Sequence, residues 1–150
     1  LKALIATGTP DCISDFKSPV LDDLSSIFAK RDEINSLFSA ENSHDVVRAI
    51  AHQTTSLAAE INQAYSRQSP LSVLSTITSI RAVRLSPDMA TAIDYEFRFT
   101  ARSLSDADFL EGVRAMLIDK DHAPNWKYKT FDDVSDDIIA HMLAPLDAPA

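Results

Sequence analysis

The chain has 150 residues, which suits one domain with a modest hydrophobic core. Its hydrophobic content of 45% is ordinary for a globular protein and argues against a disordered chain. No apolar run approaches the roughly 20 residues that a membrane-spanning helix needs. With 22 acidic and 14 basic residues, the formal net charge is −8. Nucleic acid is therefore not expected as a direct partner, because neutralising phosphates requires clustered Lys and Arg.

Glycine is scarce in this sequence, with only Gly8 and Gly112 present. Sheets with tight hairpins and phosphate-cradling loops usually need more glycine, whereas helices do not. The composition therefore predicts an all-α fold. The single cysteine, Cys12, excludes an internal disulfide, and the scattered histidines predict no metal site. These histidines are His44, His52, His122 and His141.

Five serines mark predicted helix starts in chain order, because a serine hydroxyl can accept a hydrogen bond from the first amides of a helix. They are Ser43, Ser69, Ser86, Ser105 and Ser135. Proline follows Ser69 and Ser86, at the first helical position, where its missing N–H is harmless. Asp108 stands three residues after Ser105, as in a capping box, and two aspartates follow Ser135.

Apolar residues recur at three- and four-residue steps after these signals and predict helices. Each set is interpreted as the side of a helix that faces the core. The sets are Leu57, Ile61, Ala64 and Tyr65; Leu71, Leu74, Ile77, Thr78 and Arg81; Met89, Ile93, Phe97 and Ala101; and Phe109, Val113, Met116 and Leu117. Residues 7–20 and 119–130 are predicted to be irregular loops, and the tail from Pro145 is predicted to fray.

The last of these predicted helices contains Gly112, although a glycine there costs roughly 1 kcal/mol relative to alanine. Gly112 is interpreted as a position of close helix packing, where a methyl group would clash. The alternative is an exposed position that tolerates the loss. Glu111 and Arg114 are three residues apart and can form an ion pair.

The sequence DFLEGVRAMLIDKD at 108–121, followed by Pro124 and Trp126, resembles the C-terminal signature of 3-hydroxyisobutyryl-CoA hydrolases, members of the crotonase superfamily. Glu96-Phe97-Arg98 is similar to the Glu-Tyr-Arg of that family. Segments 38–40 and 69–73 also resemble it, so the resemblance covers about residues 32–144. The sequence departs from the family pattern at Tyr128, where a proline is usual.

The resemblance implies the helical C-terminal domain of a crotonase-like protein. Residues 1–31 would be a connector and helix from the end of the crotonase core, 32–144 the helical domain, and 145–150 a frayed tail. The family's glycine-rich catalytic spiral, which supplies backbone N–H groups to an oxyanion, is absent from this chain. No catalytic residue of the family maps onto the sequence, so the chain alone is expected to be inactive.

The resemblance also implies a function for the intact protein, which would be a CoA thioester hydrolase of valine breakdown or a related enoyl-CoA hydratase/isomerase. This part would cap the active site and help to hold CoA, which enters as part of the substrate and not as a cofactor. Lys120, Trp126 and Met116 are the expected CoA contacts, because a cation beside an aromatic ring suits the 3′-phospho-ADP end. The expected structural signature is Glu96, Arg98, Glu111, Gly112, Arg114, Asp119, Asp121 and Pro124.

The expected partners are the crotonase core of the same protein, the acyl-CoA substrate and further copies joined through the core. The family is mitochondrial in eukaryotes and cytoplasmic in bacteria. One alternative is a non-catalytic component of a larger assembly, such as a mitochondrial ribosome. Another is a free-standing helical interaction module. At the level of single residues, Trp126 could instead anchor the loop while the lysines near it are solvated.

Overall fold

The structure is a computed structural model of the 150-residue chain that describes residues 27–85 and 87–146. The chain forms two compact units, Leu1–Ser36 and Leu37–Ala150. Helix α3 (Arg31–Leu37) belongs to the first unit except for its last residue, Leu37, which is the first residue of the second unit. Most of the predicted connector, including the loop at 7–20 and Cys12, lies outside the described residues, as do Ser86 and residues 147–150.

The second unit is helical throughout its regular structure. Its α-helices are α4 (Ser43–His52), α5 (Ser56–Tyr65), α6 (Pro70–Leu85), α7 (Met89–Ser103), α8 (Phe109–Val113) and α9 (Asp136–Leu143). A π-helix, η2 (Arg114–Ile118), continues α8, and a short 3₁₀-helix, η3 (Phe131–Asp133), precedes α9. No strand occurs in 27–85 or 87–146, so the all-α prediction is confirmed for these residues.

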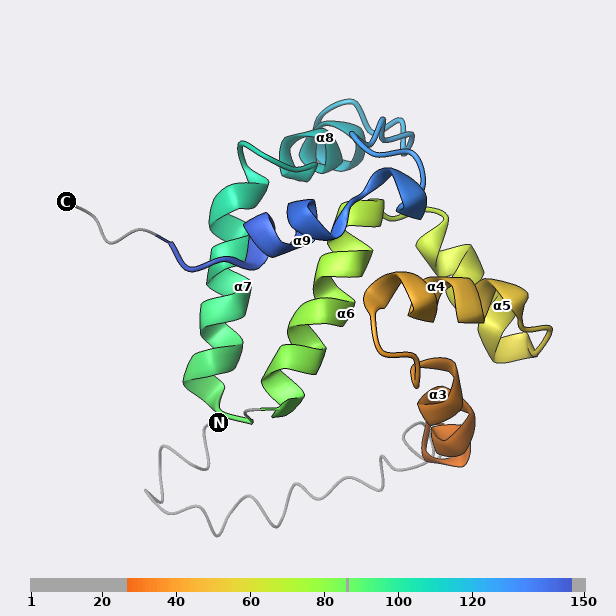
Figure 1. The fold of residues 1–150 in the computed structure, drawn as a ribbon. Helices are drawn as coiled ribbons and strands as arrows, with labels where there is room; N and C mark the ends of the chain where they lie inside the picture. The colour runs from red at the N-terminus through yellow and green to blue at the C-terminus, as the bar shows by residue number, and fades with distance from the viewer. Residues whose placement is uncertain (1–26, 86, 147–150) are drawn as a thin grey trace, which may run out of the picture. The chain divides into compact units, whose positions relative to one another are not determined.

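Helix α6 lies at the centre of this unit. Figure 1 shows α6 and α7 running side by side, with α9 crossing both and α4 against α6. Leu71 and Leu74 of α6 are fully buried, together with Ile50 of α4 and Met142 of α9. Ile77 is buried as well, so the three aliphatic positions predicted for α6 are confirmed, whereas Thr78 and Arg81 of the same set are only half-buried.

The helix starts agree with the sequence in part. The hydroxyl of Ser135 caps α9, and the hydroxyl of Ser69 accepts a hydrogen bond from the Ser72 amide at 3.3 Å. Two other predicted caps are wrong by one or more residues. Asn42, not Ser43, caps α4 through the Asp45 amide, and Ser105 lies in a turn before α8 begins. Asn, Asp and Ser cap helices about equally well, so the serine alone did not identify the start.

Helix α7 shows the largest disagreement with the predicted core. Its stripe of Met89, Ile93 and Phe97 is exposed, at 74%, 60% and 62% of the accessible surface. Instead, Arg98 and Arg102 face the C-terminal end of α9 and donate hydrogen bonds to the carbonyls of Leu143 (3.1 Å) and Ala144 (2.6 Å). These bonds satisfy carbonyl groups that a helix end leaves without partners.

The prediction of which residues of the helix at 109–118 face the core is also wrong in part. Phe109, Met116 and Leu117 are exposed, and only Val113 is partly covered. Helical spacing identifies an apolar side but does not say which polypeptide covers it. Here this side borders a cavity that α6 and α7 also line, so its larger side chains are not packed into the core.

Candidate functional site

Arg114 organises the loop that follows η2. Its guanidinium binds Glu111 through two hydrogen bonds, at 2.9 and 2.7 Å, which is the bidentate geometry that arginine makes best with a carboxylate. The same guanidinium contacts Asp119 at 2.6 Å, Asp121 at 2.8 Å and the carbonyl of Ala123 at 3.2 Å. The predicted Glu111–Arg114 pair is therefore one side of a larger network that folds residues 119–123 back onto the helix.

Glu111 extends the network to the far end of the loop, because its Oε1 accepts a hydrogen bond from the Asn125 amide at 2.6 Å. The hydrogen bonds from Arg114 and from this amide lower the pKa of Glu111 from 4.5 to about 2. Arg114 and the Ala123 amide likewise lower the pKa of Asp121. Four signature residues, Glu111, Arg114, Asp119 and Asp121, thus share one structural role.

A Glu111→Gln variant is expected to lose part of the acid sensitivity of the wild-type chain. Folding lowers the pKa of Glu111, so the unfolded chain binds more protons between pH 4.5 and about 2. The contribution of the carboxylate to stability is therefore present above pH 4.5 and is lost as the pH falls towards 2. Urea unfolding followed by circular dichroism at several pH values would measure it. A wild-type-minus-variant difference that stays constant across this window would contradict the assignment.

Gly112 lies under the ring of Trp126. A Cβ atom built on Gly112 would meet the Cη2 and Cζ3 atoms of Trp126 at 3.6 Å, which is an ordinary van der Waals contact. The expected clash of a methyl group is therefore wrong, and the neighbour is a loop tryptophan and not a second helix. The prediction of close packing is correct only in that Trp126 covers this turn of α8.

The turn that carries Lys120 has an unusual backbone. Lys120 and His122 both adopt positive φ angles, of 56° and 53°. The Asp119 amide donates to the Arg114 carbonyl at 2.8 Å, which is the five-residue step of a π-helix. Left-handed residues other than glycine and single π-turns are both uncommon, and both concentrate at functional sites. Lys120 and Met116 are exposed here, as a ligand contact requires.

Two cavities lie beside Trp126. One, of about 570 Å³, is bordered by α6, α7 and α8, and its lining includes Glu96, Gly112 and Met116. The other, of about 710 Å³, is lined by Arg67, His122 and Pro124 among others. Trp126, Met116 and Gln68 line both cavities. Two of the three predicted CoA contacts, Trp126 and Met116, are therefore close together, whereas Lys120 lines neither cavity.

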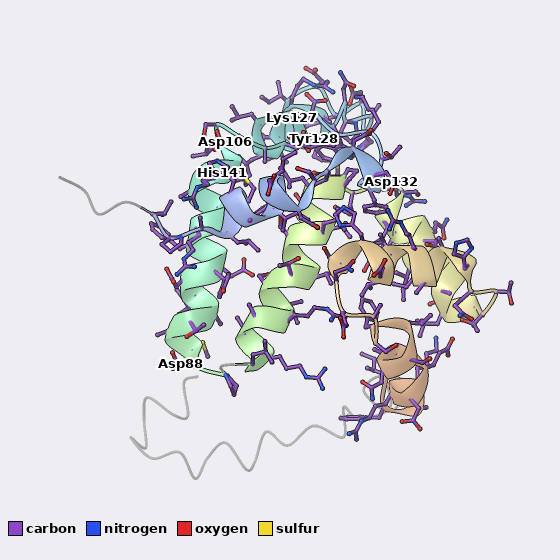
Figure 2. All side chains as sticks on the ribbon, in the orientation of Figure 1. Asp88, Asp106, Lys127, Tyr128, Asp132 and His141 are labelled. Carbon is purple, nitrogen blue, oxygen red and sulfur yellow. The ribbon has the colours of Figure 1, made fainter. Side chains whose placement is uncertain are left out.

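The other lysines of the loop serve its own structure. The ammonium of Lys127 donates to the Asp106 carbonyl at 2.9 Å and lies 5.6 Å from the centre of the Tyr128 ring. Figure 2 shows these side chains together near His141, whose Nε2 is 3.0 Å from Asp106. Lys129 binds the Trp126 carbonyl at 2.7 Å, which holds the tryptophan backbone in place.

A buried carboxylate joins this loop to the start of α6. Asp108 is only 6% exposed and accepts hydrogen bonds from the hydroxyl of Ser69 and the amide of Lys127, each at 2.6 Å. The family-like Ser-Pro segment and the signature helix are therefore connected directly. This contact fixes the wall of the two cavities on the side of Trp126.

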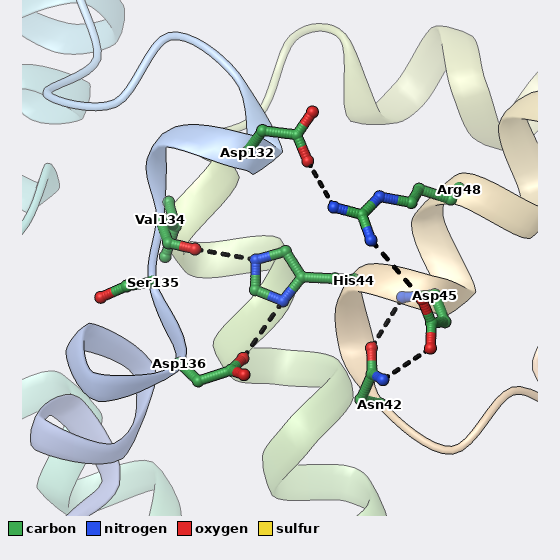
Figure 3. A pocket seen from close by; sticks show the side chains of 8 residues that line it. All are labelled: Asn42, His44, Asp45, Arg48, Asp132, Val134, Ser135 and Asp136. Atoms are coloured by element: carbon green, nitrogen blue, oxygen red, sulfur yellow. Dashed lines mark hydrogen bonds and ion pairs between the residues drawn. The ribbon is translucent and has the colours of Figure 1, made fainter.

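A third cavity, of about 280 Å³, lies between α4 and the start of α9 (Figure 3). His44 Nε2 lies 2.8 Å from the carbonyl of Val134, and its Nδ1 lies 3.3 Å from Asp136. Arg48 binds Asp132 at 2.7 Å. The polar groups of this cavity are paired with one another, so they connect α4 to the C-terminal segment instead of offering free ligands.

No group of three or more His, Cys, Asp or Glu side chains suited to a metal ion occurs among residues 27–85 and 87–146. Within the same described residues, no helix is long and apolar enough to cross a membrane. The sequence did not single out Arg67 as a site residue. It lies in the turn between α5 and α6, far in sequence from the signature, and only the folded chain brings it to Trp126.

Comparisons with known proteins agree with the fold. The sequence profile described as enoyl-CoA hydratase/isomerase matches residues 2–143. The crystal structure of an enoyl-CoA hydratase from Rhodobacter sphaeroides 2.4.1 superposes with a TM-score of 0.74 and 38% sequence identity. That match covers 80% of this chain and 35% of the other.

Among curated proteins, the mitochondrial 3-hydroxyisobutyryl-CoA hydrolase of Mus musculus is 34% identical over 81% of this chain and 31% of its own length. The small ribosomal subunit protein mS47 of Arabidopsis thaliana is 29% identical over 90% of this chain and 34% of its own length. The chain therefore spans about a third of the relatives that it matches. On the profile match and the structural similarity, the chain belongs to the enoyl-CoA hydratase/isomerase family of the crotonase superfamily, and it corresponds to the helical C-terminal region of its 3-hydroxyisobutyryl-CoA hydrolase relatives.

Proposed function

We propose that this chain is the C-terminal helical part of a 3-hydroxyisobutyryl-CoA hydrolase-like thioesterase. It covers the active site of a crotonase core and helps to hold the CoA end of the substrate. The chemistry of thioester hydrolysis belongs to the core, and the chain alone is inactive. In a eukaryote the intact protein would be mitochondrial, as the names of the hydrolase relatives state for those proteins.

The observation that carries this proposal is the set of large apolar side chains that the second unit leaves exposed. Ile93 and Phe97 of α7, Phe109 of α8, and Met116 and Leu117 of η2 are each more than half exposed. Globular proteins seldom leave so many large apolar side chains in water unless another surface covers them. The relatives have about two thirds of their length outside the match, so a catalytic core is the natural covering surface.

The cavities beside Trp126 support a role in holding CoA. An indole ring can stack on the adenine of CoA, and Met116 is a flexible apolar side chain that adapts to such a ligand. Lys120 lies on the same turn as His122 and could supply a positive charge to the phosphates. The Arg114 network gives this turn a defined conformation without any contribution from the ligand.

A chimeric enzyme would test the proposal. The matched region of the mouse hydrolase would be replaced by this chain, and release of free CoA from 3-hydroxyisobutyryl-CoA would be followed with a thiol reagent. We expect hydrolysis by the chimera and none by this chain alone or by the mouse core without any C-terminal region. A soluble, folded chimera that releases no CoA while the parent enzyme does would contradict the proposal.

The similarity to a ribosomal subunit protein favours a second candidate, a non-catalytic component of a larger assembly. The match to mS47 covers 90% of this chain, a larger share than the mouse hydrolase match covers. Sedimentation of the intact protein with mitochondrial ribosomes, combined with an inactive chimera, would favour this candidate over the enzyme. An active chimera would favour the hydrolase.

A further inference from the structure

The larger cavity beside Trp126 has an unusual charge for this chain. The whole protein carries a formal charge of −8, yet the cavity of about 710 Å³ is lined by Arg67 and His122 and by no carboxylate. Its remaining lining includes Gln68, Met116, Pro124 and Trp126. A cavity of this size is typical of small-molecule sites, and its charge favours an anion.

Arg67 differs from most arginines of the second unit. Arg48 and Arg114 bind carboxylates, Arg98 binds both a carboxylate and a carbonyl, and Arg81 and Arg102 bind backbone carbonyls. Among residues 37–85 and 87–146, only the guanidinium groups of Arg67 and Arg84 have no hydrogen bond or ion pair. Arg84 lines none of the cavities described above, so Arg67 is the arginine that is both unpaired and placed at a site.

His122 comes from the loop after η2, far from Arg67 in the sequence, but it lines the same cavity. Its positive φ angle and the hydrogen bond from its amide to the Ala115 carbonyl, at 3.1 Å, fix its backbone. Its ring has no hydrogen bond or ion pair within the described residues. An imidazole and a guanidinium beside an indole ring together supply donors for a phosphate and a surface for a base.

We infer that this cavity is a phosphate subsite, in which Arg67 and His122 hold a phosphate of a nucleotide whose base stacks on Trp126. The inference rests on the proposed function, which identifies that nucleotide as the 3′-phospho-ADP end of CoA. It adds Arg67, from the turn between α5 and α6, to the residues that select CoA over an unphosphorylated thioester. Arg67 is a binding residue and takes no part in hydrolysis.

Trp126 makes the test direct, because it is the only tryptophan of the chain. Adenosine 3′,5′-bisphosphate would be titrated into the 150-residue chain while tryptophan fluorescence is recorded, with adenosine and inorganic phosphate as comparison ligands. We expect quenching by the bisphosphate at concentrations at least about tenfold lower than by adenosine, since charge-assisted hydrogen bonds to phosphate are the stronger interaction. The affinity should fall as salt is added.

Three variants test which side chains are responsible for binding the bisphosphate. Arg67→Met should weaken bisphosphate binding roughly tenfold or more and leave adenosine binding unchanged, whereas Arg84→Met, the matched unpaired arginine, should bind like the wild type. His122→Asn should weaken binding as well, since asparagine tolerates a positive φ angle and removes the imidazole. Arg67 is exposed and unpaired, so unchanged circular dichroism should accompany its replacement.

Each outcome separates the inference from the proposed function. Equal bisphosphate affinity in the wild type and Arg67→Met overturns the phosphate subsite. If the bisphosphate still quenches the tryptophan fluorescence of both proteins, nucleotide binding at Trp126 keeps its support. Bisphosphate that quenches no better than adenosine also overturns the subsite. If the chimera hydrolyses its substrate but the bisphosphate never quenches, the proposed function stands without this subsite. An inactive chimera together with no quenching removes both.

Discussion

Replacing Leu74 by alanine is expected to lower the free energy of unfolding of the chain by about 2–5 kcal/mol. Leu74 is fully buried in α6, the helix that contacts α4, α7 and α9. Removing three carbon atoms there takes apolar contacts from several helices and leaves a cavity that packed neighbours fill only in part. A domain of this size has a total stability of only about 5–15 kcal/mol, so the loss is a large share of it.

Urea unfolding followed by circular dichroism would measure this change, and Leu85→Ala provides a matched control. Leu85 is the last residue of the same helix and is 89% exposed, so the same substitution there should change the free energy by no more than about 0.5 kcal/mol. Similar effects of the two substitutions would mean that α6 is not the centre of the core.

Prediction from sequence worked best where one segment contained the whole signal. The spacing of Leu71, Leu74 and Ile77 predicted a helix and its buried positions, because α6 is enclosed by other helices of the same chain. The pair of Glu111 and Arg114 also followed from a three-residue spacing. The all-α fold followed from the scarcity of glycine together with these patterns.

Prediction failed where the answer depended on distant residues. The stripe of Met89, Ile93 and Phe97 has helical spacing, but its covering surface is not among the described residues of this chain. The π-turn at η2 and the positive φ angles of Lys120 and His122 occur where Arg114 binds several acidic groups at once, an arrangement that spacing does not reveal. Arg67 reaches Trp126 only through the packing of α5, α6 and the loop.

Replacing Phe97 by aspartate is expected to have its largest effect outside the isolated chain. Phe97 is 62% exposed, so the substitution should change the free energy of unfolding of the chain by no more than about 0.5 kcal/mol. If a crotonase core covers this side, the same change removes about 1.5–3 kcal/mol of apolar burial and also buries a charge. We therefore expect association with the core to weaken by roughly 100-fold or more.

Isothermal titration of this chain with a separately produced mouse hydrolase core would measure that association. Ala59→Asp serves as the control, because it places the same charge at an exposed position of α5, away from α7 (Figure 1). Equal affinities for the Phe97→Asp chain and the wild type would show that this side is not the interface.

The two measurements on Phe97→Asp carry more weight together than either does alone. An unchanged stability of the free chain excludes general unfolding as the reason for lost association, so the loss must arise at the surface that α7 presents. A destabilised free chain would instead mean that Phe97 already packs within this chain. Its exposure would then no longer be evidence that a crotonase core covers it. The proposed function therefore depends on a side chain that contributes little to folding here and a great deal to assembly.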